Sequence, residues 1–192
     1  MSRPLRTFIA VAASREVRSR ARQLIGQLSG TAATVRWVEP ENLHFSLKFL
    51  GDVDLLEVPT VCEAVTRAVA SLPPFEIVAR GAGAFPDLDR PRTIWLGVAD
   101  GSEQMVELNA VVERELAPLG FRREARRFRP HLTIGRVRDG RPGLSELGHL
   151  LRQQADFVGG VVSVDEVIVF SSQLDRDGPI YEPLATATLD GH

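Results

Sequence analysis

The stretch Leu43–Gly51 reads LHFSLKFLG, and a second stretch, His131–Val137, reads HLTIGRV. Both start with the same pattern: histidine, apolar residue, hydroxyl residue, apolar residue. Side chains of a β-strand alternate between two faces, so His44 and Ser46 point one way and their apolar neighbours the other. Each stretch therefore predicts a strand that buries one face and presents an imidazole and a hydroxyl about 7 Å apart on the other.

The segments that precede these two strands also resemble each other. Thr7–Ala13 (TFIAVAA) is similar to Thr93–Ala99 (TIWLGVA), and each is followed by a helical pattern and then by a histidine strand. From the first residue of the segment to the histidine, the separation is 37 residues in the first copy and 38 in the second. The alternative is a chance likeness of the kind any α+β protein can show. We interpret the repeat as a duplicated unit.

The duplication predicts an α+β fold of two pseudo-two-fold related lobes. We expect each lobe to be an antiparallel sheet with helices packed on it, and a central cleft to lie between the lobes. The chain, 1–192, is then a single bilobed domain with halves of approximately 1–92 and 93–192. The pattern leaves open whether the chain termini are exchanged between the lobes.

Apolar periodicity and turn residues predict the remaining elements. Expected helices cover Ser14–Leu28, Leu55–Leu72, Ser102–Leu119 and Leu144–Ala155. Further strands are expected over Val35–Val38, Phe75–Ala84, Val158–Phe170 and Tyr181–Leu189.

Composition narrows the class of protein. Apolar residues make up 44% of the 192 residues, which is enough for a core, and the formal net charge of -2 gives no global attraction to nucleic acid. The single cysteine, Cys62, excludes an internal disulfide and a multi-cysteine zinc site, and it favours a reducing, cytoplasmic setting. The apolar run Phe8–Ala13 is too short to cross a membrane, and we expect no membrane association.

Two histidine faces that meet across a cleft suit one type of reaction. Opening a cyclic phosphodiester needs a base that deprotonates water and an acid that protonates the departing sugar oxygen. Imidazole can fill either role, since its unperturbed pKa is about 6.5. The hydroxyls of Ser46 and Thr133 can bind the phosphate oxygens and hold phosphorus between His44 and His131. This chemistry requires no metal and no cofactor.

The stretches ENLHFSLKFLG and RPHLTIGRV resemble the paired His-x-Thr-x (HxTx) motifs of the two-histidine (2H) phosphoesterase superfamily. The likeness is closer to its bacterial RNA 2′,3′-cyclic phosphodiesterases, also called 2′-5′ RNA ligases, and it covers nearly the whole chain, including RTFIAV, WVEPENLH, GAGAFP and PRTIWLGV. The resemblance implies a bilobed fold, hydrolysis of RNA 2′,3′-cyclic phosphates to 2′-phosphomonoesters, and reversible, ATP-independent 2′-5′ ligation. It implies that His44 is the proton donor and His131 the proton acceptor. Ser46 departs from the usual threonine.

An arginine-rich segment surrounds the second motif. Between Phe121 and Arg141, eight arginines stand against Glu124 and Asp139: Arg122, Arg123, Arg126, Arg127, Arg129, Arg136, Arg138 and Arg141. Such a cluster can attract an RNA backbone, or it can be a solvated loop. Arg129 is two residues before His131, so strand alternation places both side chains on one face. The same alternation turns Arg136 to the opposite face unless a bulge intervenes. Lys48 is four residues after His44, so strand alternation places it on the same face, and it is a further candidate for phosphate contact.

The other aromatic and histidine residues carry less information. We interpret Phe45 and Phe49 as core residues, and Phe85 and Phe128 could stack on a nucleobase, although the sequence favours neither. His149 lies on the polar side of a short helix, and His192 is terminal.

Several functions remain open beside the RNA-end cyclic phosphodiesterase. One alternative is a non-catalytic RNA-binding module. A second is a metal-dependent hydrolase with the two histidines as ligands, although no third ligand stands at motif spacing. A third is a relative that acts on 2′-5′ oligonucleotides or on cyclic ADP-ribose phosphates. The expected partners are RNA with 2′,3′-cyclic phosphate ends or cyclic nucleotides, and a monomer suffices because both motifs lie in one chain.

Overall fold

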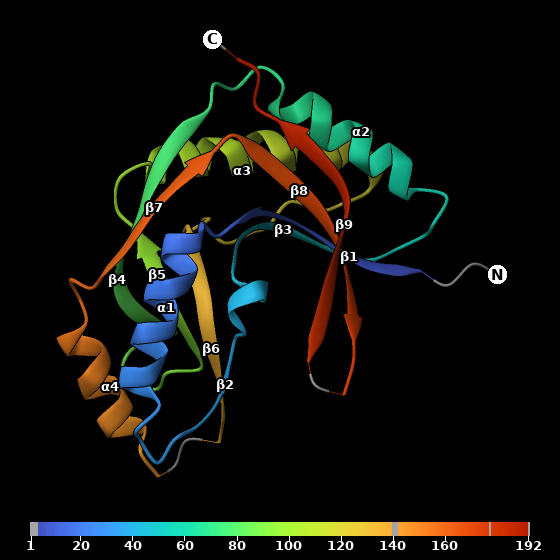
Figure 1. Cartoon of the computed structure of the whole chain (residues 1–192). Helices are drawn as coiled ribbons and strands as arrows, with labels where there is room; N and C mark the ends of the chain where they lie inside the picture. The colour runs from blue at the N-terminus through green and yellow to red at the C-terminus, as the bar shows by residue number, and fades with distance from the viewer. Residues whose placement is uncertain (1–3, 140–141, 177, 192) are drawn as a thin grey trace.

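The computed structural model describes residues 4–139, 142–176 and 178–191, so Arg141 and His192 lie outside the described residues. Within these ranges the chain forms four α-helices, two short 3-10 helices and one strongly curved antiparallel sheet (Figure 1). The helices are α1 (Arg15–Leu28), α2 (Val58–Val69), α3 (Ser102–Leu116) and α4 (Leu144–Gln153), and the 3-10 helices are η1 (Pro40–Asn42) and η2 (Ala117–Leu119). The strands are β1 (Leu5–Ala12), β2 (Thr34–Trp37), β3 (His44–Val53), β4 (Phe75–Phe85), β5 (Thr93–Val98), β6 (His131–Asp139), β7 (Val158–Val164), β8 (Glu166–Leu174) and β9 (Pro179–Thr188).

Helix α1 shows how local sequence sets these bounds. The side chain of Ser14 accepts a hydrogen bond from the backbone N–H of Val17, which caps one of the free donors at the helix start. Val17, Ala21, Leu24 and Leu28 recur on one face and are fully buried. The same combination of a helix-spaced apolar face and a sheet beneath it holds the other helices.

The strand order of the sheet is β7-β4-β5-β6-β3-β1-β8-β9, and β2 pairs with β6 beside this path. Every pairing is antiparallel. The two inner strands, β6 and β3, meet at one residue pair, Phe45 opposite Leu132. This joint separates a lobe of β3, β1, β8 and β9 from a lobe of β6, β5, β4 and β7, and the predicted α+β fold with antiparallel lobes is confirmed.

Each lobe contains elements from both halves of the chain. Strand β4 comes from the first half but pairs with β5 and β7, whereas β8 and β9 come from the second half and extend the sheet beyond β1. Helices α2 and α3 lie side by side above one lobe, and α1 and α4 lie together against the other (Figure 1). The lobes are therefore interleaved along the chain.

Apolar residues from both lobes form one buried cluster. Phe45 and Leu132 belong to it and are fully buried at the joint, so the residues that flank them along each strand face away from the core. Among the described residues, no helix is long and apolar enough to cross a membrane.

Candidate active site

His44 and His131 are the first residues of β3 and β6, and both rings are held in the same way. Nδ1 of His44 lies 2.7 Å from the carbonyl oxygen of Asn42, and Nδ1 of His131 lies 2.7 Å from the carbonyl oxygen of Arg129. A carbonyl only accepts, so Nδ1 carries the proton and donates in both cases. The other ring nitrogen, Nε2, is left in each histidine to accept or deliver a proton.

The joint between the lobes brings the two motifs together. Because β3 and β6 run antiparallel, continuing the Phe45–Leu132 register by one residue places each histidine opposite the hydroxyl residue of the other motif. The resulting quartet on one face of the sheet consists of His44 opposite Thr133 and Ser46 opposite His131.

Neither hydroxyl of the quartet is engaged elsewhere. Ser46 is exposed and Thr133 is half-buried. Within the part of the chain that the structure describes, neither side chain has a hydrogen-bond partner. Both hydroxyls are therefore free to bind the oxygens of an anion placed between the imidazoles.

A bulge follows the hydroxyl residue in each motif. The β1–β3 register passes from Ala10 opposite Ser46 to Ile9 opposite Lys48, which skips one residue of β3. The β5–β6 register likewise passes from Trp95 opposite Thr133 to Ile94 opposite Gly135. One extra residue reverses the face of every side chain that follows it. Strict alternation therefore predicts the wrong face beyond each bulge.

The first bulge turns Lys48 into the core, and the prediction that it shares the face of His44 is wrong. Lys48 is only 4% exposed, and its Nζ lies 2.7 Å from Oε2 of Glu113 on α3 and 2.8 Å from the carbonyl oxygen of Arg122. Lys48 thus forms a structural ion pair with Glu113 and is not placed to contact phosphate. The same bulge turns Phe49 outward, where it is 51% exposed, so the interpretation of Phe49 as a core residue is also wrong.

The second bulge brings Arg136 onto the face of His131. Alternate residues of β5 lie opposite Arg136, Thr133 and His131, so these three side chains share one face. Arg136 is exposed, and its Nη1 lies 3.5 Å from the hydroxyl of Thr93. Its charge contributes to lowering the pKa of both His44 and His131.

A second arginine stands beside Arg136. Arg36 on β2 is its cross-strand partner, and like charges directly opposite each other are unfavourable without a counter-ion. Among the described residues, no carboxylate forms an ion pair with either guanidinium. This pair, next to the quartet, provides the positive charge that an anion site needs.

His44 lies in an aromatic surrounding that the sequence did not reveal. Its ring centroid is 4.8 Å from that of Phe8 and 5.4 Å from that of Tyr181, which meets it edge-on. A pocket of about 300 Å³ opens beside it, lined among others by Phe170 and Arg18. Burial is the main cause that lowers the pKa of His44 below 6.5, ahead of the charges of Arg136 and His131.

His131 lies in a second aromatic surrounding. Its ring meets Phe85 edge-on at 5.0 Å, and the guanidinium of Arg129 lies 5.1 Å from the centroid of Phe85 and 5.9 Å from that of Trp95. A pocket of about 530 Å³ opens on this side. Burial lowers the pKa of His131 below 6.5, and the nearby Arg129 and Arg136 lower it further.

A sequence profile described as the 2′-5′ RNA ligase superfamily matches residues 12–176, which include both motifs. The chain belongs to the 2′-5′ RNA ligase superfamily. The resemblance of the paired motifs to the two-histidine phosphoesterases is thereby confirmed.

Curated relatives support this membership of the 2′-5′ RNA ligase superfamily. An RNA 2′,3′-cyclic phosphodiesterase of Thermotoga maritima is 34% identical over 97% of this chain and 97% of its own length. One of Methanothermobacter thermautotrophicus is 37% identical over 96% of this chain and 99% of its own.

Solved structures agree with the fold of this superfamily member. A Thermus thermophilus crystal structure superposes with a TM-score of 0.82 at 24% identity, covering 98% of this chain and 100% of that one. Escherichia coli LigT crystallised with 3′-AMP gives a TM-score of 0.76 at 24% identity, covering 97% and 98%. These likenesses concern the fold alone.

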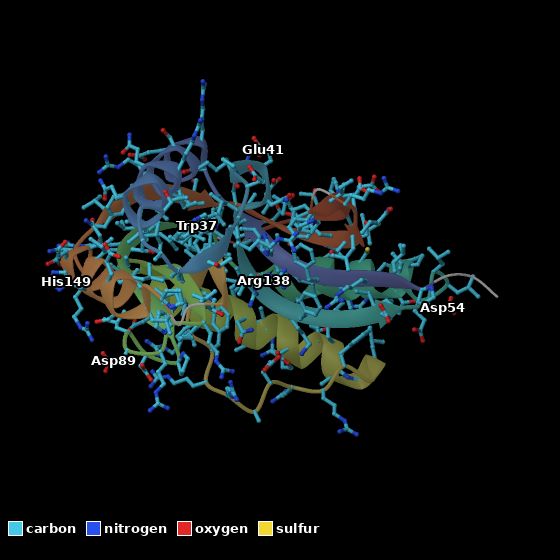
Figure 2. All side chains as sticks on the ribbon, turned by 90° about the horizontal axis from the view of Figure 1, so that it is seen from below. Trp37, Glu41, Asp54, Asp89, Arg138 and His149 are labelled. Carbon is cyan, nitrogen blue, oxygen red and sulfur yellow. The ribbon has the colours of Figure 1, made fainter. Side chains whose placement is uncertain are left out.

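The remaining candidates from the sequence are placed as follows. Arg129 and Arg136 lie at the site, whereas Lys48 does not. His149 projects from α4 at the edge of the molecule, away from the centre where Trp37 and Arg138 lie (Figure 2). Five arginines in the segment before β6 are exposed: Arg122, Arg123, Arg126, Arg127 and Arg129. Among the described residues, no three histidine, cysteine, aspartate or glutamate side chains are grouped so as to hold a metal ion.

The sequence missed residues that form the walls of the site. Tyr181 and Phe8 reach His44 from β9 and β1, and Arg36 reaches the site from β2. Tyr181 is the single tyrosine of the chain and begins the expected strand Tyr181–Leu189. The pairing of β8 with both β1 and β9 brings this strand near β3, and the edge-on ring contact shows that Tyr181 faces His44.

Proposed function

We propose that this member of the 2′-5′ RNA ligase superfamily is an RNA 2′,3′-cyclic phosphodiesterase that opens terminal cyclic phosphates to 2′-phosphomonoesters. The observation that carries the proposal is the matched pair of imidazoles. Both are fixed through Nδ1 at 2.7 Å from a backbone carbonyl, and both flank the one joint between the lobes. The names of the curated relatives point to the same reaction.

In the proposed reaction, the hydroxyls of Ser46 and Thr133 and the guanidinium of Arg136 bind the non-bridging oxygens of the cyclic phosphate. Nε2 of His131 takes a proton from water as its oxygen bonds to phosphorus. The bond from phosphorus to the sugar O3′ breaks, and the protonated His44 gives its proton to O3′. The product carries a 2′-phosphate and a free 3′-hydroxyl, and a positioned acid and base each contribute about 10²–10⁴-fold.

The surroundings of the two rings support His44 as proton donor and His131 as proton acceptor. The guanidinium of Arg129 lies over the rings of Phe85 and Trp95 beside His131, and its charge favours a neutral imidazole there. The ring of Phe8 lies 4.8 Å from that of His44 at an interplanar angle of 34°, and an aromatic face attracts a cationic ring. The uneven charge therefore favours a base at His131 and an acid at His44.

The same groups serve 2′-5′ ligation when an RNA 5′-hydroxyl replaces water. Ligation exchanges one phosphate ester for another, so it is reversible and consumes no ATP. Both imidazoles come from one chain, so the proposed enzyme acts as a monomer. A cytoplasmic setting, in which Cys62 stays reduced, completes the proposal.

The test compares three histidine variants on a 2′,3′-cyclic nucleotide, with EDTA present. His44→Ala and His131→Ala should each lower kcat by 10²-fold or more, since each removes one proton-transfer group. His149→Ala is the matched control, because this imidazole lies on α4 away from the joint, and its activity should equal that of the wild type (Figure 2).

Each other outcome selects a competing function. Full activity in His44→Ala or His131→Ala would refute the assignment. Loss of activity on chelation, with recovery on added zinc or manganese, would indicate a metal-dependent hydrolase. Salt-dependent RNA binding without turnover would indicate a binding module, and turnover restricted to 2′-5′ oligonucleotides or cyclic ADP-ribose phosphates would indicate a relative with another substrate.

A further inference from the structure

Each imidazole lines a pocket of its own. His44 lines the pocket of about 300 Å³ that lies between η1, β8 and β9, and His131 lines the pocket of about 530 Å³ that lies between β4, β5 and the segment before β6. Volumes in this range suit a ligand of nucleotide size. Hydrolysis of a cyclic mononucleotide places a nucleoside on one side of phosphorus only, so it does not use both pockets.

The geometry of displacement at phosphorus gives each pocket a separate task. The attacking and leaving oxygens lie roughly in line on opposite sides of phosphorus. With His44 delivering a proton to the leaving O3′, the nucleoside that carries the cyclic phosphate lies on the side of His44. The attacking oxygen lies on the side of His131, where the larger pocket opens.

We propose that the pocket beside His131 binds the 5′-hydroxyl nucleoside of a second RNA end, so that the enzyme has a built site for the attacking alcohol in ligation. This inference rests on the proposed function and names the second substrate of the same site. Nε2 of His131 takes the proton of the 5′-hydroxyl, and O5′ bonds to phosphorus. The bond from phosphorus to O3′ breaks, and the protonated His44 gives its proton to O3′. The product is a 2′-5′ phosphodiester, and no further reactant is consumed.

The lining of this pocket fits a nucleoside followed by a phosphate chain. Phe85, Trp95 and Phe128 supply aromatic surfaces on which a base can stack. Arg127 also lines the pocket, is exposed, and has no carboxylate partner among the described residues. It begins a run of exposed arginines that continues through Arg126 toward Arg122, along which the phosphates downstream of the 5′ end can lie.

The pocket beside His44 differs in these respects. It is smaller, and its lining contains Glu41 as well as Arg18. Its lining comes from β1, α1, η1, β3, β8 and β9, with Arg18 as its lining arginine. The larger volume, the three aromatic side chains, and Arg127 with the exposed arginines before it favour the His131 side for the second RNA end.

The experiment measures how one cyclic-phosphate donor divides between water and a 5′-hydroxyl oligoribonucleotide. Phe128 lines the pocket without a ring contact to His131, so Phe128→Leu should lower the ratio of 2′-5′ ligation to hydrolysis roughly tenfold, as expected for a lost stacking surface. Arg127→Gln should lower the same ratio several-fold. Arg67→Gln is the matched control, because this exposed arginine lies on α2, which packs against α3 and β9 in the other lobe, and it should leave the ratio unchanged.

A second measurement reports on the pocket without turnover. The chain has two tryptophans, so in a Trp37→Phe background the fluorescence of Trp95 alone reports on this pocket. A 5′-hydroxyl oligoribonucleotide that lacks a cyclic phosphate should quench this fluorescence, and Phe128→Leu should weaken the quenching by about the same factor as the ratio.

The outcomes separate this inference from the proposed function. Equal loss of hydrolysis and ligation in Phe128→Leu would place the cyclic-phosphate nucleoside in this pocket and overturn the inference. Absence of quenching, or hydrolysis without any 2′-5′ product at saturating 5′-hydroxyl RNA, would also overturn it. A wild-type enzyme that hydrolyses no cyclic phosphate contradicts the proposed function, whereas the fluorescence of Trp95 still decides whether the pocket binds a 5′-hydroxyl end.

Discussion

Ser46 stands where the related motifs have threonine, and its role depends on the hydroxyl alone. The side chain is exposed and has no hydrogen-bond partner among the described residues. Ser46→Ala should therefore lower kcat/KM about 10- to 100-fold, the effect of one lost hydrogen bond to a charged group. Ser46→Thr should stay within a few-fold of the wild type, because threonine keeps the hydroxyl and only stiffens χ1. Steady-state kinetics on a cyclic nucleotide measure both variants, and equal activity of the alanine variant would exclude Ser46 from phosphate binding.

The charge of Arg136 leads to a prediction about the pH dependence of kcat/KM. Burial lowers the pKa of both imidazoles, and the charge of Arg136 lowers both further. The bell-shaped profile of kcat/KM should therefore have its maximum below pH 6.5. Arg136→Gln removes a positive charge, which makes protonation of each imidazole easier, so both pKa values rise and the maximum moves to higher pH.

Histidine NMR titration of the free protein checks this shift separately from the loss of phosphate binding that the same variant causes. Arg123→Gln removes an equal charge from an exposed position before β6 and should leave both titrations unchanged. An Arg136→Gln protein with unaltered histidine titrations would show that Arg136 does not act on the imidazoles.

At the scale of single elements, strand β3 is held in its bulged form by α3. Nδ2 of Asn109 donates to the carbonyl oxygen of Leu47 at 2.8 Å, at the bulge itself. The Lys48–Glu113 pair lies next to it, with side chains only 3% and 9% exposed. These contacts fix the bulge that keeps Ser46 and His44 on the active face while Lys48 enters the core.

Removal of one member of this pair should therefore destabilise the protein strongly. Lys48→Met leaves the Glu113 carboxylate buried without its cation, which costs about 3–5 kcal/mol. The double variant Lys48→Met/Glu113→Leu removes both charges and should recover most of that stability. Urea unfolding measures the free energy of each variant. A Lys48→Met protein as stable as the wild type would contradict the structural role given to Lys48.

The elements also show what could be predicted from the sequence and what could not. The period of apolar residues predicts β3 and β6 and the shared face of each histidine and hydroxyl, because that part of each strand is regular. Alternation fails beyond Ser46 and Thr133, where each bulge reverses the faces of Lys48, Phe49 and Arg136. A bulge depends on the neighbouring strand and on side chains such as Asn109, which are far away in sequence, so local pattern does not reveal it.

For the whole molecule, the order of the strands in the sheet is the feature that the local sequence pattern predicts least well. The repeat predicts two similar lobes, but β4 crosses to the lobe of β5, and β8 and β9 join β1. This exchange brings Tyr181 to His44 and Phe85 to His131, so each imidazole receives an aromatic neighbour from a strand distant in sequence. The division into halves 1–92 and 93–192 stays a prediction, since the lobes combine strands from both.

The net charge of the molecule is negative, whereas the segment before β6 is positively charged. This difference should appear in the salt dependence of catalysis. The formal net charge is -2, so RNA is not attracted by the protein as a whole. The exposed arginines before β6 act only on phosphates that lie along them. Hydrolysis of a cyclic mononucleotide should therefore change little with salt. For the 5′-hydroxyl oligoribonucleotide that is joined in ligation, log(1/KM) should fall with log[salt] by about 0.7 for each phosphate contacted.

The variant Arg122→Gln/Arg123→Gln locates that attraction. It should reduce the magnitude of the oligonucleotide slope by up to about 1.4, since each lost contact removes about 0.7, and leave the mononucleotide unaffected. Charge spread over the whole surface would instead give both substrates a similar slope that this variant hardly changes. The result thus decides whether the segment before β6 recognises RNA beyond its reacting end or whether recognition stops at the pockets beside His44 and His131.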